Sequence, residues 1–77
     1  MQLNTEKLKG YEQLKVARIV AGYTQKSLAK KLGVTTGAVN QWETGRAAPK
    51  IEKLKPLADA LGVSVDDLVL AIMQKAG

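Results

Sequence analysis

Residues 36 to 44 carry side chains suited to hydrogen bonding without charge. At about 100° per residue, a helix here places the polar residues and the glycine on one side: Thr36, Gly37, Asn40, Gln41 and Thr44. Amides can bond adenine through two hydrogen bonds, hydroxyls donate or accept, and small apolar groups contact the thymine methyl. The stripe has the chemistry of a surface that reads base edges, although a weakly charged solvent-facing helix would show the same residues.

Polar and cationic residues flank this stretch. Gln25 and Lys26 open another expected helix, and a helix N-terminus favours a bound phosphate. Arg46 and Lys50 follow the stretch at its other end. Phosphate contacts at the rim with base-reading groups in the middle are typical of a module that reads duplex DNA.

Positive charge is concentrated in the first part of the chain. The 77 residues have a net charge of +5. Residues 1–46 hold eight Lys or Arg against three acids, whereas residues 47–77 hold four of each. This asymmetry favours a polyanionic partner near the N-terminal half.

The composition leaves little room for catalysis. There is no Cys and no His, which removes disulfides, thiolate and imidazole metal ligands and the usual nucleophile-base pairs. The adjacent acids Asp66 and Asp67 fall in the first turn of an expected helix, where carboxylates favour the helix dipole. We expect no enzymatic activity, cofactor, metal or small-molecule ligand.

The length fits one small domain. Residues 1–10 are interpreted as an N-terminal arm or short extra segment, and residues 11–77 as the domain. No apolar run approaches the roughly 20 residues of a membrane span, and the start does not resemble a signal peptide. We therefore expect a cytoplasmic protein without a membrane partner.

Helix signals recur, and no stretch alternates as a strand does. The fold class is predicted to be all-α, a compact bundle of five helices near residues 11–21, 25–32, 36–44, 53–61 and 65–74. Thr24, Thr35 and Ser64 are the expected N-caps, and Gly33 ends the second helix. Pro56 either lies in the first turn of a fourth helix that starts near Lys53, or kinks that helix.

The apolar faces of these helices predict the core. Its expected members are Leu14, Ala17, Ala21, Leu28, Ala29, Leu32, Val39, Trp42, Leu54, Leu57, Leu61, Val63 and Leu68. Residues 68–73 form a longer apolar run than one core-facing stripe can bury. This run is either a fully buried terminal helix or a self-association surface, with candidate interface residues Leu68, Val69, Ile72 and Met73.

A second apolar excess lies on the first expected helix. Val16, Ile19 and Val20 face away from its core side. Residues 1–10, which include Leu3 and Leu8, would cover this patch, or a partner protein would. An unstructured tail is an equally reasonable interpretation of these ten residues.

The run TQKSLAKKLGVTTGAVNQWETGRAAP, from Thr24 to Pro49, resembles the helix-turn-helix of the phage repressor and Cro family. The similarity extends from about Gln13 to Leu68 and includes the R-x3-G-Y-T-Q entry, the W-E-x-G-R exit and the L-A-D-A-L-G-V-S-x-D-x-L run. The short turn of residues 33–35, which contains a glycine, suits the corner of such a motif. The resemblance implies a lambda repressor-like domain, and a small transcriptional repressor that reads the major groove of double-stranded DNA with residues 36–44.

The resemblance also assigns roles to residues. Thr36, Gly37 and Gln41 match the principal base-facing positions, and Asn40 would assist them. Gln25 would bond a phosphate and brace the recognition helix. The other positions that match backbone contacts are Thr44, Arg46 and Lys50, with Lys26 beside Gln25. Arg18 and Glu43 match a buried ion pair.

Gly37 departs from the pattern, because many relatives carry an amide or hydroxyl side chain there. It either admits a close thymine methyl or backbone approach, or reads nothing. Family members usually bind as two-fold dimers, so the resemblance implies a homodimer on a palindromic operator. The resemblance also implies a bacterial or phage-encoded, nucleoid-associated protein. The same bundle serves in DNA-binding antitoxins and in bridging interaction modules, and this alternative stays open.

Overall fold

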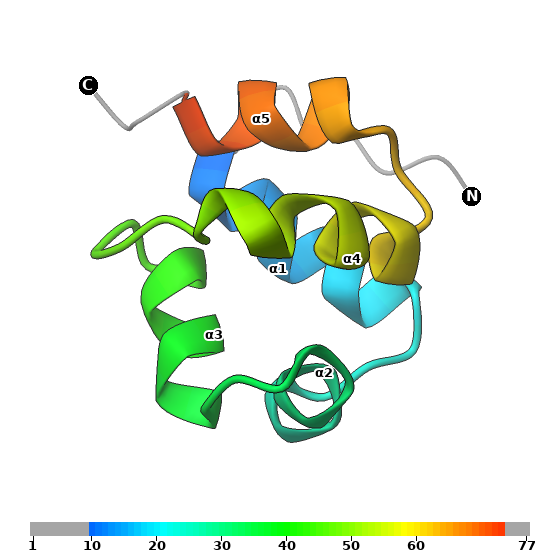
Figure 1. Ribbon diagram of the computed structural model, residues 1–77, viewed down its shortest axis with the longest axis vertical. Helices are drawn as coiled ribbons and strands as arrows, with labels where there is room; N and C mark the ends of the chain where they lie inside the picture. The colour runs from blue at the N-terminus through cyan, green and yellow to red at the C-terminus, as the bar shows by residue number, and fades with distance from the viewer. Residues whose placement is uncertain (1–9, 74–77) are drawn as a thin grey trace.

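The computed structural model describes residues 10–73, which form five helices (Figure 1). They are α1 (Gly10–Val20), α2 (Gln25–Leu32), α3 (Thr36–Glu43), α4 (Ile51–Leu61) and α5 (Val65–Met73). The described residues contain no strand, so the expected all-α bundle is confirmed. None of the described helices is long and apolar enough to cross a membrane.

Short-range hydrogen bonds set both ends of α2 and the start of α3. Thr24 and Ser27 cap α2 reciprocally, each backbone N–H donating to the other's hydroxyl oxygen at 2.9 Å. Gly33 ends α2 in the left-handed conformation, with φ of +70°. Thr35 then caps α3 through the Ala38 N–H at 3.0 Å. The caps and the two-helix corner are those the sequence predicts.

The start of α1 differs from the prediction. Gly10 is the first residue of α1 and is buried, so the helix begins one residue earlier than expected. Leu3 and Leu8 lie outside the described residues, as does residue 74, the expected end of the last helix. At its other end α1 stops at Val20, and Ala21 is exposed, so Ala21 is not a core residue.

The fourth helix begins earlier than its proline suggests. It starts at Ile51, so Pro56 lies inside α4 and not in its first turn. An interior proline leaves one carbonyl, here that of Glu52, without its helical donor. Because Glu52 is exposed, water can bond that oxygen. The apolar face of α4 is buried at Leu57, Ala58 and Leu61, after the proline.

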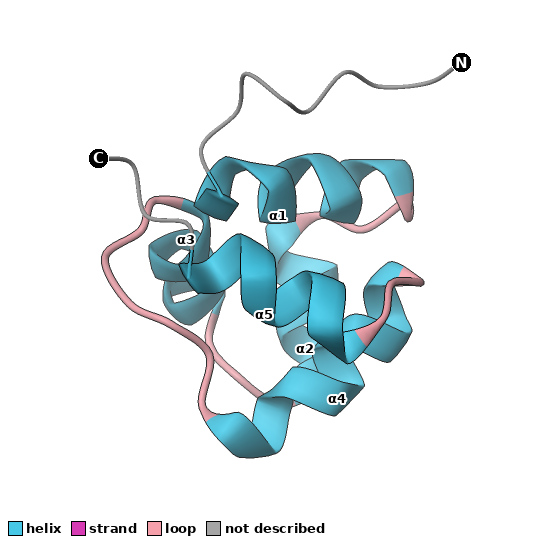
Figure 2. Ribbon diagram, turned by 90° about the horizontal axis from the view of Figure 1, so that it is seen from above, coloured by secondary structure: helices cyan, strands magenta, loops and turns pink. Residues whose placement is uncertain are grey.

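The helices pack in a closed circuit around the core. Contacts run from α1 to α3, from α3 to α2, from α2 to α4, from α4 to α5 and from α5 back to α1. α5 lies above both α1 and α4 in Figure 1 and therefore in front of them in Figure 2, which is seen from above. The helix-turn-helix corner is formed by α2 and α3. These two helices lie on the side of the molecule away from α5 (Figure 1).

The buried core follows the prediction closely. Trp42 is buried in the core, as expected of a lone tryptophan. Ala17, Leu54 and Val63 are partly buried against the core. Among the buried hydrophobic residues of the described chain, Ala58 and Ala71 were not predicted, because alanine is a weak hydrophobic signal in sequence. The fully or nearly buried hydrophobic residues are Leu14, Leu28, Ala29, Leu32, Val39, Trp42, Leu57, Ala58, Leu61, Leu68 and Ala71.

A lysine joins α4 to the end of α2. The Lys53 Nζ donates to the Leu32 carbonyl at 2.8 Å, in a half-buried position. Leu32 is the last residue of α2, so its carbonyl has no helical donor, and a cation there also favours the helix dipole. This contact fixes the helix-turn-helix corner against the rest of the bundle.

We predict that Lys53→Met lowers the free energy of unfolding by about 1–2 kcal/mol, because the methionine keeps the apolar stem and loses the charged hydrogen bond. Urea unfolding measures the change. Lys55→Met is the matched control, since Lys55 pairs with Asp59 at 3.7 Å on the surface, where an ion pair contributes little. Equal losses in the two variants would contradict the role given to Lys53.

Candidate nucleic-acid interface

The outer face of α3 is polar and fully accessible. Its buried side is formed by Val39, Trp42 and Glu43, and Ala38 is half-buried. All four predicted base-contacting residues are exposed: Thr36, Gly37, Asn40 and Gln41. The face therefore carries two amides and a hydroxyl next to a position without a side chain, on a rigid helix.

A buried carboxylate anchors this helix. Glu43 is 7% exposed, and its two oxygens accept from Arg18, at 2.6 Å from Nε and 3.2 Å from Nη2. Gln25 Nε2 donates to Glu43 Oε1 at 3.1 Å. Arg18 in turn donates from Nη1 to the Tyr23 carbonyl at 2.8 Å. One network thus joins α1, the loop before α2, the first residue of α2 and the last residue of α3.

The network explains how Gln25 is oriented. The Gln25 amide has two N–H groups, and one of them is committed to Glu43. The second N–H remains for an anion at the start of α2, where the free backbone N–H groups of a helix also point. The bracing role that the resemblance implies for Gln25 is therefore matched by a hydrogen bond to α3.

Exposed cations lie on the segments that flank α3 along the chain. Lys26, Arg46 and Lys50 are all exposed. Within residues 10–73 the ion pairs are Arg18–Glu43 and Lys55–Asp59, so none of these three cations is neutralised by a carboxylate of that part of the chain. They come from three different segments: α2, the loop after α3 and the residue before α4.

The end of α3 holds Arg46 in place through its backbone. The N–H groups of Arg46 and Ala47 both donate to the Gln41 carbonyl, at 3.0 and 3.3 Å. The Thr44 hydroxyl donates to the Asn40 carbonyl at 3.0 Å. Since a hydroxyl has a single proton, Thr44 would donate to a phosphate only after turning away from Asn40.

A close contact that sequence reasoning missed lies beside this loop. Gly45 has φ of +77°, and a Cβ built there would lie 2.8 Å from Tyr11 Cδ1. The ring at the start of α1 therefore packs directly on the backbone that leads to Arg46. No local pattern joins these two positions, because they are far apart in the chain.

The predicted interface on α5 is only partly available. Leu68 is 2% exposed, so it belongs to the core and is not an interface residue. Val69 and Ile72 are half-buried, and Ile72 packs against the core. Met73 is 72% exposed and Leu70 is 58% exposed. The apolar run of α5 therefore has some side chains in the core and others on the surface, and the helix is not completely buried.

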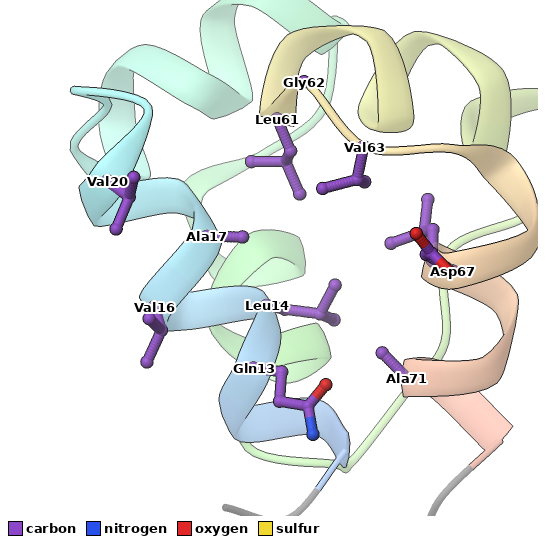
Figure 3. A pocket seen from close by; sticks show the side chains of 11 residues that line it. Gln13, Leu14, Val16, Ala17, Val20, Leu61, Gly62, Val63, Asp67 and Ala71 are labelled. Carbon is purple, nitrogen blue, oxygen red and sulfur yellow. The ribbon is translucent and has the colours of Figure 1, made fainter. Parts of the chain in front are cut away.

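An apolar groove lies between α1 and α5 (Figure 3). Leu14 and Ala17 point toward its floor from α1, and Leu61 and Val63 close one end. Asp67 is its acidic residue. The exposed Val20, part of the apolar patch predicted on the first helix, lies at its rim. The groove involves neither α2 nor α3, so it is separate from the polar face.

Within residues 10–73, no group of His, Cys, Asp or Glu side chains could hold a metal ion. The adjacent Asp66 and Asp67 lie in the first turn of α5, and the Glu43 carboxylate is already bonded to Arg18 and Gln25.

The helix circuit, the capped two-helix corner and the polar outer face define a lambda repressor-like helix-turn-helix domain. The helix-turn-helix family model matches residues 9–68. The chain belongs to this family, in the branch of the phage repressor and Cro type.

Relatives and solved structures agree with this assignment. A prophage-derived HTH-type transcriptional regulator of Bacillus subtilis, YonR, is 40% identical over 58 residues, which are 75% of this chain and 54% of the relative. The transcriptional repressor RstR of a cryptic phage in Vibrio cholerae is 33% identical, covering 74% of this chain and 51% of the relative. The chain thus spans about half the length of these two regulators.

Among structures, the P22 c2 repressor in complex with a synthetic operator has a TM-score of 0.73 and 32% identity, covering 80% of this chain and 94% of that chain. The clp gene regulator ClgR from C. glutamicum has a TM-score of 0.69 and 32% identity, covering 87% of each chain. These similarities confirm the fold class over most of the described residues.

We predict that Glu43→Ala lowers the free energy of unfolding by about 3–5 kcal/mol, because Arg18 is left buried without its partner. Thermal unfolding measures the loss. The double variant Arg18→Met with Glu43→Leu should recover much of the stability, since it leaves no unpaired charge. Asp59→Ala is the control from the exposed pair, with an expected change below about 1 kcal/mol.

We also predict that Gly45→Ala lowers the free energy of unfolding by about 2 kcal/mol or more, because alanine is strained at this φ and its Cβ collides with Tyr11. Gly62→Ala is the matched control. Gly62 has φ of +70° and nothing within 4 Å of a built Cβ, so it shares the strain without the collision. Similar urea midpoints for the two variants would show that the Tyr11 contact is unimportant.

Proposed function

We propose that this chain binds double-stranded DNA in a sequence-specific manner and acts as a small transcriptional repressor. One observation carries the proposal: the exposed, uncharged polar face of α3, with exposed cations on neighbouring segments that form no ion pair within residues 10–73. A face meant only for charge attraction would carry lysine or arginine at its centre. A merely solvated face would mix charges of both signs.

In the proposed mode of binding, α3 lies in the major groove. Gln41 and Asn40 bond base edges through their amides, and Thr36 through its hydroxyl. Phosphates on both sides of the groove are contacted by Gln25, Lys26, Thr44, Arg46 and Lys50. These contacts set the register of α3 on the duplex without reading its sequence. The network around Glu43 holds α2 and α3 at a fixed angle, so the two kinds of contact form together.

The partner that we propose is a palindromic operator bound by a homodimer. Half-sites about one helical turn apart would let two copies present α3 to one face of the duplex. The exposed end of α5, with Met73, Val69 and Leu70, is the candidate contact between copies, and Ile72 supports it from the core side. We place the protein in the cytoplasm at bacterial or phage DNA, with no catalytic role, cofactor, small-molecule ligand or membrane partner.

Selection of bound sequences from a random duplex pool tests the proposal, with sedimentation of the protein alone and with the selected duplex. We expect a palindromic consensus and a complex of two chains per duplex. No enrichment would overturn sequence-specific binding. It would move the interpretation to a protein-interaction module or an antitoxin that needs its partner.

We predict that Gln41→Ala weakens binding to the selected site by about 5- to 150-fold while binding to unrelated DNA stays unchanged, because it removes a base contact and no phosphate contact. Lys26→Ala should weaken binding to both and reduce the salt slope by about one. Fluorescence anisotropy at several salt concentrations measures both effects. Lys55→Ala, on α4, is the control cation. A Gln41 variant with unaltered discrimination would refute the assignment of α3.

A further inference from the structure

The loop of residues 44–48, which follows α3, places no side chain of its own in the core. Glu43 before it and Pro49 after it are buried, whereas the residues between them are all exposed. Gly45 gives the loop additional backbone freedom, since glycine adopts its φ of +77° without strain. The position of Arg46, a candidate phosphate contact on this loop, therefore depends on contacts made to the loop backbone.

The loop backbone is held from two sides. On the α3 side, the N–H groups of Arg46 and Ala47 donate to the Gln41 carbonyl at 3.0 and 3.3 Å. On the α1 side, the Tyr11 ring lies against Gly45, where a built Cβ would be 2.8 Å from Cδ1, 2.9 Å from Cε1 and 3.3 Å from Cγ. One edge of the ring therefore faces the position that a side chain would occupy. Glycine permits so close an approach because it has no Cβ.

Tyr11 can hold the loop because the helix that carries it is anchored in the bundle. Tyr11 is the second residue of α1 and is itself half-buried. Leu14, one turn further on, is in the core, and Arg18 bonds the buried Glu43 carboxylate at the end of α3. The ring and the end of α3 are thus attached to one frame, and the loop is held against both.

Open space lies on both sides of the contact between Tyr11 and Gly45. Tyr11 lines one hollow together with Arg46 and Pro49. It lines a second hollow together with Asn40 and Thr44. Because the ring borders both hollows, its removal would leave the Gly45 backbone with free space on the α1 side.

We propose that Tyr11 is a positioning residue for DNA binding: its ring holds the Gly45 backbone so that Arg46, the next residue, is directed at a phosphate. Tyr11 itself does not touch the duplex. This inference rests on the proposed function, because it requires Arg46 to contact DNA. It gives α1, which carries none of the predicted DNA contacts, a role in binding.

A double-mutant cycle tests whether Tyr11 acts through Arg46. Fluorescence anisotropy at several salt concentrations gives the affinities of wild-type protein, Tyr11→Ala, Arg46→Ala and the double variant for the selected duplex and for unrelated DNA. We expect each single variant to weaken binding to both duplexes and to reduce the salt slope by up to about one, the value for one phosphate contact. In the Arg46→Ala background, Tyr11→Ala should change the affinity by less than about twofold.

Control variants separate positioning from lost packing and from a direct contact. Tyr11→Phe keeps the ring and should bind DNA as the wild type does, since ring carbons make the contact with Gly45. Leu54→Ala truncates a partly buried side chain on α4, and should lower the unfolding temperature without changing the salt slope. Binding is measured below the unfolding transition of the least stable variant, as followed by circular dichroism. If Tyr11→Ala does not fold, Tyr11→Leu takes its place in the cycle.

Three results overturn the inference while leaving the proposed function standing. Losses from Tyr11→Ala and Arg46→Ala that add in the double variant would show that Tyr11 does not act through Arg46. A Tyr11→Phe variant as weak as Tyr11→Ala would show that the hydroxyl itself contacts DNA. An unchanged affinity and salt slope in Tyr11→Ala would show that the ring has no role in binding. Wild-type protein that binds no duplex would instead overturn the proposed function, and the inference with it.

Discussion

The buried carboxylate of Glu43 is the constraint on which the arrangement of this domain depends. A charge in the interior is costly unless it is paired and hydrogen-bonded, and here Arg18 and Gln25 together supply three N–H donors. Those donors come from α1 and α2, while the carboxylate comes from the last residue of α3. Satisfying one charge therefore fixes the relative positions of three helices. The angle of the helix-turn-helix corner follows from this requirement as much as from the turn itself.

This anchoring divides α3 into two sides with different tasks. The inner side is held by Val39 and Trp42 in the core and by Glu43 at its edge, so the outer side needs no stabilising contacts of its own. It can carry short polar groups and even a glycine. The cations lie on separate neighbouring segments, and the Arg46 backbone is kept near the helix by the hydrogen bond of its N–H to the Gln41 carbonyl. A rigid centre with charged surroundings is the arrangement expected of a surface that must match a regular polyanion.

Local signals predicted much of the fold. Thr24 and Thr35 are caps and Gly33 is a helix stop because each acts on backbone groups within a few residues. The sequence left open whether Pro56 lies in the first turn of α4 or inside the helix, because the rule for proline is also local. It accounts for the lost hydrogen bond at Pro56, but not for the burial of Leu57 and Ala58 that keeps the helix continuous around it. The long apolar run of α5 was ambiguous for the same reason, since only packing shows that Leu68 faces inward and Met73 outward.

The sequence by itself determined the all-α class, the caps of the two-helix corner and the polar stripe of α3, because helical periodicity places those residues without any knowledge of the rest of the chain. The tertiary structure decided which distant groups meet. Lys53 reaches the Leu32 carbonyl across 21 residues, and Tyr11 packs on the backbone of Gly45. It also showed that position 37 has room for a side chain that it lacks. Contacts of this kind depend on how helices pack in three dimensions, and no pattern of nearby residues encodes them.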